Sequence, residues 1–295
     1  MLRPGSTVVM KKLYFFIAAL IAAALFAGCT TLDERQRAWI FQPSDRTWGG
    51  GLAAAEGMED VWIPLASTNK PDAVMNGNST DTKLHGLWLG AAKPNAPVML
   101  YLHGARYNVT GSAPRIRRMQ ELGFSVLAID YRGFGKSSPG LPSEATAHAD
   151  ARAAWDWLGQ QYPQQKRFIF GHSLGGPIAI QLAADVPDES GTLVEGTFTS
   201  IADIVGASKW GWVPVSLLIT QRFEAIKKVA QIGSPLLVVH GAEDQLIAPS
   251  LGRKLFDAAA EPKLFVLVEG GSHHNTNLVG MPQYREALAR LFALK

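Results

Sequence analysis

Cysteine is almost absent from this chain of 295 residues: Cys29 is the only one, so no disulfide can form within the chain. Charge of one sign is not in excess either, because 28 Lys and Arg against 25 Asp and Glu give a formal net charge of +3. This mild balance does not indicate nucleic acid as a partner. No histidine or carboxylate cluster has the spacing of a metal site, so neither a metal nor an organic cofactor is expected.

One apolar run near the N-terminus, from Leu13 to Ala27, directly follows two lysines. It is shorter than the ~20 residues that a helix needs to span a bilayer. Lysines, an apolar run and small residues after it are typical of a secretory signal peptide, which we expect over residues 1–28. Because Met10 directly precedes the lysines, the start of translation stays open between Met1 and Met10.

The end of this run, Leu25-Phe26-Ala27-Gly28-Cys29, resembles the lipobox of bacterial lipoproteins. The resemblance implies that Cys29 is lipidated and becomes the first residue after cleavage. Phe26 departs from the smaller residue usual at its place, and an ordinary signal peptide with a chance cysteine is the alternative. Thr30, in place of an aspartate, matches the sorting preference for the outer membrane. We therefore expect a lipid-anchored protein of the cell envelope that faces the periplasm.

The remainder of the chain suits one large domain, since 47% of all residues are hydrophobic and 18% are charged. Residues 29–58 are expected to form a tether, with Pro43 and three glycines as breakers. Over residues 59–295, apolar strand-like runs alternate with helix-like segments. This alternation predicts the α/β class, with a mostly parallel sheet, helices on both faces and an opening antiparallel pair. The one basic cluster, Arg115 to Met119, could face lipid headgroups, but a solvated helix face is the favoured interpretation.

The sequence Gly171-His172-Ser173-Leu174-Gly175 lies between a predicted strand and a predicted helix. A serine on such a sharp turn sits in strained backbone, where side chains two residues away on either side would collide. Glycines at both of these positions remove the collision and leave the serine hydroxyl exposed. The pattern therefore predicts a nucleophilic serine, Ser173, at the carboxyl end of a sheet strand.

A serine hydroxyl needs a base to take its proton, and a histidine base needs a carboxylate to orient it. Asp244 and then His273 follow Ser173 in the chain, each in a loop after a predicted strand. We favour these two residues as acid and base. His274 stays open as the base, and three carboxylates stay open as the acid: Glu243, Glu195 and Asp203.

An oxyanion hole requires two backbone N–H donors near the nucleophile. Leu174 follows Ser173 directly and is the first candidate, and Ala105 in the loop after another predicted strand is the second. His103 in this loop is interpreted as a residue that fixes the loop. Arg106 either faces the substrate or forms a structural ion pair.

Residues 201–232 are rich in apolar side chains, among them Trp210 and Trp212. They predict a short lid over an acyl-binding pocket, to which both tryptophans would contribute. A core helix without substrate contact is an equally weighted alternative.

Six motifs carry a family resemblance over roughly residues 60–293: LYLHGARYN, LAIDYRGFGKSS, GHSLGG, FTSIAD, VVHGAEDQLIAP and GGSHHNT. They resemble the α/β-hydrolase superfamily, in particular its lysophospholipase-like and monoacylglycerol-lipase-like branch. The resemblance implies Ser173, Asp244 and His273 as the triad, with Leu174 and Ala105 as oxyanion donors. It also implies structural roles for the aspartate and arginine of DYRG, Asp130 and Arg132. The sequence His103-Gly104-Ala105-Arg106 has alanine after the HG pair, where many relatives carry asparagine. This departure concerns Ala105, the second expected oxyanion donor.

The expected function is that of a serine hydrolase that cleaves small-molecule acyl esters through an acyl-enzyme. An amidase or peptidase of the same fold is the first alternative, because the motifs do not distinguish ester from amide. The second is a non-catalytic envelope-binding lipoprotein, because a fold by itself does not establish a function.

Overall fold

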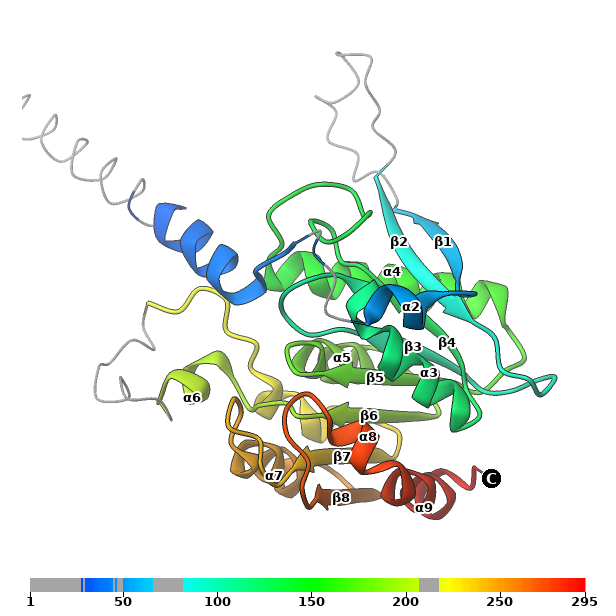
Figure 1. Ribbon diagram of the computed structural model, residues 1–295. Coiled ribbons are helices and arrows are strands. Elements are labelled where there is room, and N and C mark those ends of the chain that lie inside the picture. The colour runs from blue at the N-terminus through cyan, green and yellow to red at the C-terminus, as the bar shows by residue number, and fades with distance from the viewer. Residues whose placement is uncertain are drawn as a thin grey trace, which may run out of the picture.

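The computed structural model describes residue 28 and residues 30–44, 46, 50–65, 82–206 and 218–294. Its centre is a single eight-stranded sheet in the order β1-β2-β4-β3-β5-β6-β7-β8 (Figure 1). The strands are β1 (Glu59–Pro64), β2 (Lys83–Leu89), β3 (Val98–Leu102), β4 (Ser125–Ile129), β5 (Arg167–His172), β6 (Gly191–Glu195), β7 (Leu236–Gly241) and β8 (Lys263–Val268). β2 is antiparallel to both β1 and β4, and all other neighbours are parallel. The predicted sheet and its opening antiparallel pair are confirmed.

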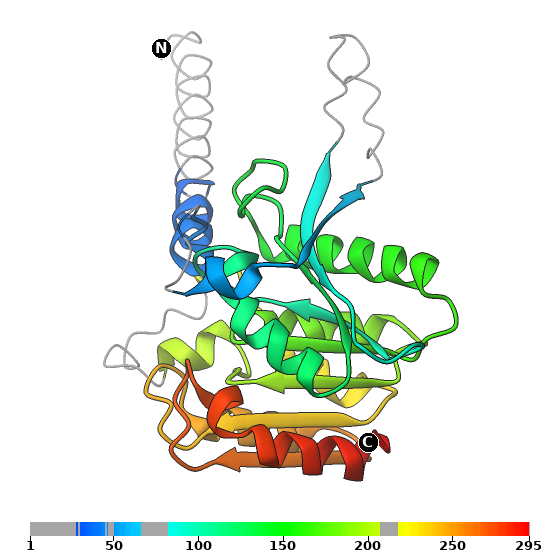
Figure 2. The same ribbon diagram turned by 45° about the vertical axis from the view of Figure 1, so that its right-hand side comes forward.

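Helices cover both faces of this sheet, as the alternating segments predict (Figure 2). One face packs against α4 (Glu144–Gln161), α5 (Gly175–Asp185) and α7 (Pro249–Ala258). The other packs against α3 (Ala113–Glu121) and α9 (Met281–Phe292). Shorter elements are α2 (Gly51–Ala55), α6 (Ile201–Gly206) and α8 (Thr276–Val279), with the 3-10 turns η2 (Val109–Ser112), η4 (Ala225–Lys227) and η5 (Val229–Gln231).

The side chains of strand β3 explain why the central strands are continuous apolar runs in the sequence. Val98, Leu100 and Leu102 belong to the core under α4 and α5. Met99 and Tyr101 belong to the core on the opposite face, under α3. Successive side chains of a strand point to opposite faces, so a strand covered on both faces needs apolar residues at every position.

The segment expected to be a tether is built into the domain in part. Residues 30–41 form a helix, whose last residue, Phe41, is fully buried against Phe134 and Phe223. Arg37 Nε donates to Pro142 O at 2.9 Å, which fixes the helix to the loop before α4. The expectation of a simple tether over 29–58 is therefore wrong for this part, because Phe41 supplies a core side chain.

The basic cluster on α3 does not form a solvated face. Arg115 is mostly buried and pairs with Glu195. Arg117 donates to the carbonyl of Ala54 at 2.5 Å, and Arg118 donates to Asn277 Oδ1 at 2.9 Å. Each arginine thus ties α3 to a different segment, and the solvated interpretation is corrected.

The region of the expected lid, residues 201–232, divides into three parts. Residues 201–206 form α6, and residues 207–217, with Trp210 and Trp212, lie outside the described residues. Further along, Phe223, Ala225 and Val229 are buried in the main core, so this last part is core. A lid formed by the tryptophans stays a prediction.

The N-terminal predictions concern residues 1–27 and Cys29, which lie outside the described residues. Among the helices that the structure describes, none combines the length and the apolar character needed to cross a bilayer. The signal peptide and the lipidation of Cys29 stay predictions.

Removal of the Phe41 ring should destabilise the domain. We expect Phe41→Ala to lower the free energy of unfolding by about 3–5 kcal/mol, because it leaves a cavity between Phe134 and Phe223. The control is Trp39→Ala on the same helix, since Trp39 is 64% exposed and its loss should cost less than about 1 kcal/mol. Urea unfolding measures both. Equal losses would contradict the packing of this helix into the core.

Candidate active site

Ser173 lies in the sharp turn between β5 and α5, in the left-handed backbone conformation with φ 54°. The flanking glycines permit this turn as the sequence predicts. A Cβ on Gly171 would lie 2.3 Å from the carbonyl oxygen of Gly175, and a Cβ on Gly175 would lie 2.1 Å from that of Leu102. Both distances are far inside van der Waals contact. The N–H of Ser173 donates to the carbonyl of Glu195 at 3.0 Å, which fixes the turn to the end of β6.

The ends of three strands bring Ser173, His273 and Asp244 together. His273 Nε2 lies 3.1 Å from Ser173 Oγ, and His273 Nδ1 lies 2.8 Å from Asp244 Oδ2. Asp244 follows β7 and His273 follows β8. With the proton assigned to Nδ1, His273 donates to Asp244 and can accept the hydroxyl proton of Ser173. These are the contacts of a nucleophile, a base and an orienting acid.

Asp244 is held as an ionised carboxylate by its own loop. Its Oδ1 accepts the backbone N–H groups of Leu246 at 2.9 Å and Ile247 at 2.8 Å. Burial by itself would raise the pKa of Asp244, but hydrogen bonds from His240 and His273 outweigh it and hold this pKa well below its usual range. Asp244 therefore keeps its negative charge at neutral pH, as an orienting acid must.

The other candidate acids have different neighbours. Glu243 is exposed. Asp203 accepts hydrogen bonds from the hydroxyls of Thr199 and Ser200, near the start of α6. Glu195 is fully buried and accepts from Arg115 Nε at 3.0 Å. Asp244 is thus the candidate that binds the imidazole of His273.

His274, the other candidate base, lies next to His273 with ring centroids 5.4 Å apart. Its ring lines the pocket beside Ser173, whereas the contact with Ser173 Oγ is made by His273. Burial and the charges of His273 and Arg115 lower the pKa of His274. The geometry favours His273 as the base.

A buried ion pair supports the loop that carries His273. Arg115 Nη2 donates to the carbonyl oxygens of His273 and His274, both at 3.1 Å, while Arg115 Nε pairs with Glu195. Tyr284 donates its hydroxyl proton to the second oxygen of Glu195 at 2.5 Å. Helices α3 and α9 and strand β6 thereby meet behind the His273 loop, and Arg115 holds this loop in position.

His172 adds a second support to the same carbonyl. Its Nε2 lies 3.2 Å from the carbonyl oxygen of His273. Burial, followed by the charges of Arg115 and His273, holds the pKa of His172 well below its usual range. A neutral imidazole with its proton on Nε2 can donate this hydrogen bond.

Sequence reasoning missed the roles of Arg115, His172 and His240. A signal for Arg115 was present, because Glu195 ends an apolar strand and a buried carboxylate requires a cationic partner. The cation itself could not be chosen from the sequence, since Arg115 is 80 residues away.

The predicted oxyanion donors, Leu174 and Ala105, line the same pocket as Ser173. Gly104 allows the loop after β3 to come close, because a Cβ there would lie 2.9 Å from the Ser173 Cβ. The carbonyl of Gly104 lies 2.6 Å from His103 Nδ1, in line with the loop-fixing role expected for His103. Within the described residues, the N–H groups of Leu174 and Ala105 donate to no protein acceptor. Both remain available to a substrate oxygen.

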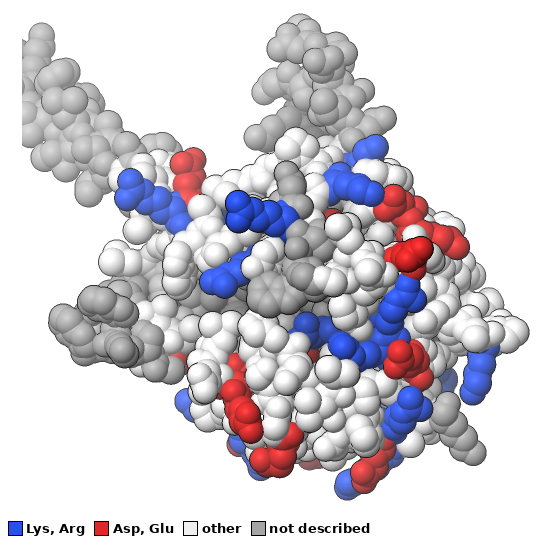
Figure 3. Space-filling view, viewed as in Figure 1, with Lys and Arg blue, Asp and Glu red and all other residues white. Residues whose placement is uncertain are grey.

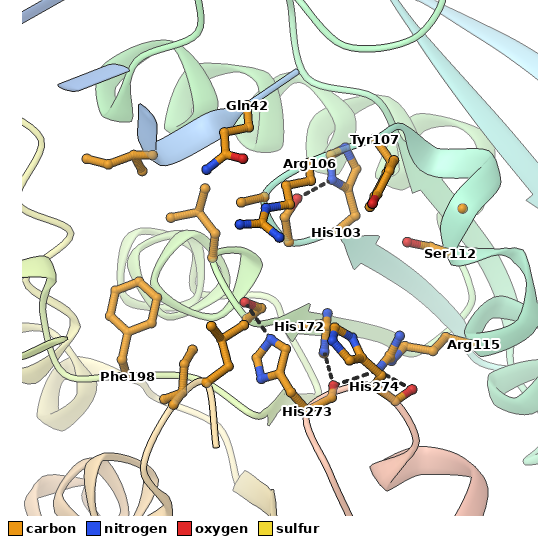
Figure 4. A pocket seen from close by; sticks show the side chains of 18 of the residues that line it. Gln42, His103, Arg106, Tyr107, Ser112, Arg115, His172, Phe198, His273 and His274 are labelled. Atoms are coloured by element: carbon orange, nitrogen blue, oxygen red, sulfur yellow. Dashed lines mark hydrogen bonds between the residues drawn. The ribbon is translucent and has the colours of Figure 1, made fainter. Parts of the chain in front are cut away.

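A cavity of 480 Å³ opens above Ser173 at the carboxyl ends of the parallel strands. In Figure 4, Phe198 lies on one side of this pocket and Arg115 on the other, with His273 between them. Arg106 lines the pocket as well. Trp210 and Trp212 fall outside the described residues, so their contribution stays a prediction. In the part of the chain that the structure describes, no three His, Cys, Asp or Glu side chains gather as metal ligands.

Comparison with known proteins relates this geometry to a family. The family model described as serine aminopeptidase, S33 matches residues 93–211. An uncharacterized protein of Mycobacterium tuberculosis is 36% identical, and the alignment covers 93% of each chain. An α/β-hydrolase domain-containing protein of Arabidopsis thaliana is 30% identical over 77% of this chain and 75% of its own length.

Two further proteins with named activities are similar. A lysophosphatidylserine lipase of Danio rerio is 28% identical over 66% of this chain and 58% of its own length. The structure of an esterase from Pyrococcus furiosus superposes with a TM-score of 0.63 at 19% identity, over 85% of this chain and 99% of that one. The elbow, the order of strands and these relatives agree, and the chain belongs to the α/β-hydrolase family.

Proposed function

We propose that the protein is a serine hydrolase of acyl esters, in which Ser173 attacks the acyl carbonyl. The observation that carries this proposal is the continuous contact from Ser173 Oγ through His273 to Asp244, with distances of 3.1 and 2.8 Å. His273 takes the proton of Ser173 as the new C–O bond forms, and Asp244 stabilises the resulting imidazolium. His273 then gives this proton to the leaving alcohol as the ester bond breaks. Water, deprotonated by His273, then attacks the acyl carbon; the bond to Ser173 Oγ breaks, His273 returns the proton to this oxygen, and the acid leaves.

The oxyanion of each tetrahedral intermediate would be held by the N–H groups of Leu174 and Ala105. Leu174 precedes the first residue of α5, so the positive end of this helix dipole lies at the same point. A donor of this kind typically contributes about 3 kcal/mol to stabilisation of the transition state. Arg106, next to Ala105, donates its own N–H to the carbonyl of Phe41 at 2.8 Å, which holds the loop in place.

An ester is favoured as substrate by the apolar part of the pocket and by the lipase among the relatives. An amide is the second candidate, because the matching family model is described as a serine aminopeptidase. A decanoyl ester and a decanoyl amide that carry the same group on the leaving oxygen or nitrogen would distinguish the two substrate classes. Turnover of the amide at a rate equal to that of the ester would favour the second candidate.

The proposal includes attachment to the membrane through Cys29 and a position in the bacterial cell envelope, outer-membrane-bound and facing the periplasm. It is supported by the lipobox resemblance at residues 25–29. Helical residues 30–41 lead into the core at Phe41, so an anchor at Cys29 would be joined to the domain by few residues.

Lipidation is tested by expression in a bacterial host with an alkyne-labelled palmitate. The wild-type protein should carry the label, sediment with membranes and have a mass that begins at Cys29. Cys29→Ser should remove the label and leave the catalytic domain folded, because Cys29 precedes the packed part of the helix. An unlabelled wild-type chain with residues 1–28 still present would rule out the anchor.

Substitution of Ser173 tests the nucleophile. Ser173→Ala should abolish labelling by a fluorophosphonate probe and lower kcat for a p-nitrophenyl ester by at least about 10⁴-fold. Ser250→Ala is the matched control, because Ser250 is exposed on α7. The probe should label this variant to the same extent as the wild type. Gel fluorescence and steady-state rates give the two readouts. Persistent labelling of Ser173→Ala would show that another residue is the nucleophile.

Arg115 and Glu195 allow the structural and positioning roles to be separated. Arg115→Met should lower the free energy of unfolding by about 3–5 kcal/mol, because Glu195 is left buried without its partner. It should also lower kcat by about 10–100-fold, since the His273 carbonyl loses a donor.

The double variant Arg115→Met/Glu195→Gln removes the unpaired charge. It should regain most of the stability in urea unfolding, whereas kcat stays low because the His273 loop still lacks its support. Full recovery of kcat together with stability would mean that Arg115 acts on the fold alone.

A further inference from the structure

Two consecutive residues of the loop after β3 have a left-handed backbone: φ is 71° at Arg106 and 60° at Tyr107. This conformation is unfavourable for residues that carry a Cβ, and it persists only where the surrounding structure holds it. We call these two residues the left-handed pair. The pair directly follows Ala105, the second expected oxyanion donor. The loop that carries this donor therefore needs support from another part of the chain.

That support comes from residues 41–44, which we call the brace. Arg106 donates its N–H to the carbonyl oxygen of Phe41 at 2.8 Å. Ser44 donates its N–H to the carbonyl oxygen of Tyr107 at 3.3 Å, and a parallel β-bridge joins the two segments at Tyr107. The brace thus pairs with the two residues whose backbone is left-handed.

The brace is fixed to the domain at the end of helix 30–41. Figure 3 shows charged side chains of both signs where this helix projects from the domain, whereas its last residue, Phe41, is apolar and fully buried. Gln42 follows with φ 47°, and its left-handed backbone turns the chain toward the loop. In Figure 4, Gln42 and Arg106 lie on the same side of the pocket, opposite His273. The position of the brace thus depends on the buried ring of Phe41 and on the turn at Gln42.

Both ends of the loop are fixed to the sheet. Gly104 lies so close to the nucleophile that a Cβ on it would be 2.9 Å from the Cβ of Ser173. Val109 donates its N–H to Oδ1 of Asp130 at 2.6 Å, and Asp130 is buried directly after β4. The left-handed pair sets the path of the chain between these two fixed points. A change of its backbone therefore displaces Ala105.

We propose that the brace positions the oxyanion hole: it keeps Arg106 and Tyr107 left-handed and so holds the N–H of Ala105 where the oxyanion forms. The inference rests on the proposed function, because it gives the brace a part in stabilising the tetrahedral intermediate. An oxyanion donor acts over about 3 Å, and a displacement of roughly 1 Å can lower a rate about 100-fold. The brace contacts no reacting atom, so its residues are positioning residues.

Gln42 allows the brace to be loosened without a cavity in the core. Gln42→Gly and Gln42→Val both remove the amide side chain, but glycine adopts φ 47° freely, whereas the β-branched valine opposes it. We expect kcat for p-nitrophenyl decanoate to be about tenfold lower in Gln42→Val than in Gln42→Gly. KM should differ less, because the loop stabilises the intermediate more than the bound ester.

Asn95 provides the matched control for the change of backbone. It has φ 57° in the turn before β3, is exposed and does not line the pocket. Asn95→Gly and Asn95→Val should have equal kcat, because Asn95 lies near the amino end of β3, whereas the site lies at the carboxyl ends of the strands. A loss of kcat in Asn95→Val as large as that in Gln42→Val would mean that loss of stability causes both, and it would overturn the inference.

A pair of inhibitors reports on the oxyanion directly. A decyl trifluoromethyl ketone adds to Ser173: the bond from Oγ to the carbonyl carbon forms, the carbonyl oxygen becomes an oxyanion, and His273 takes the hydroxyl proton. The corresponding trifluoromethyl alcohol has the same chain and cannot add. Gln42→Val should bind the ketone about tenfold more weakly than Gln42→Gly and the alcohol within about twofold of it. Equal weakening of both inhibitors would indicate a general loosening of the pocket and contradict a role at the oxyanion.

Hydrogen exchange tests the brace without any turnover. Peptides that cover residues 104–109 should exchange faster in Gln42→Val than in Gln42→Gly, because the N–H of Arg106 loses its acceptor. If the wild type hydrolyses no ester and binds the ketone no more tightly than the alcohol, the proposed function fails, whereas faster exchange in this loop still supports the brace. Equal exchange and equal kcat in the two Gln42 variants would overturn the inference.

Discussion

The left-handed backbone at Ser173 is the constraint on which the rest of the site depends. It directs the hydroxyl away from the sheet, and it exists because Gly171 and Gly175 leave room for each other and for the end of β3. The same turn starts α5 and so places the Leu174 N–H beside the hydroxyl. A side chain at either glycine would move α5, Ser173 and the Leu174 N–H together.

A buried ion pair between Glu195 and Arg115 connects the turn at Ser173 to the loop that carries His273. The carbonyl of Glu195 accepts the Ser173 N–H, while its carboxylate binds Arg115, whose guanidinium supports the His273 loop. Glu195, at the end of β6, thus contacts Ser173 through its backbone carbonyl and supports the His273 loop indirectly, through Arg115. The short distances from Ser173 to His273 and from His273 to Asp244 follow from this common support as well as from the strand order.

The fold and the meeting of Ser173, His273 and Asp244 at one edge of the sheet could be predicted because their signals are local. Apolar runs that end in glycine mark strands covered on both faces, and the glycines around Ser173 report a backbone requirement at that point. Helix 30–41 was not predicted, since Phe41 finds its partners Phe134 and Phe223 far along the chain. The sequence places Arg115 on a solvated helix face for the same reason. Periodicity indicates which face of a helix is polar, but not that this face contacts a buried carboxylate, here Glu195.

The proposed function requires that the ester is cleaved through an acyl group on Ser173. The most direct measurement is rapid mixing with a p-nitrophenyl ester, with p-nitrophenol release followed in parallel with intact mass and peptide mapping. We expect a burst of about one p-nitrophenol per protein molecule when deacylation is slower than acylation, and an acyl adduct on the peptide that contains Ser173. A burst without an adduct on the peptide that contains Ser173, or an adduct on a different residue, would contradict it.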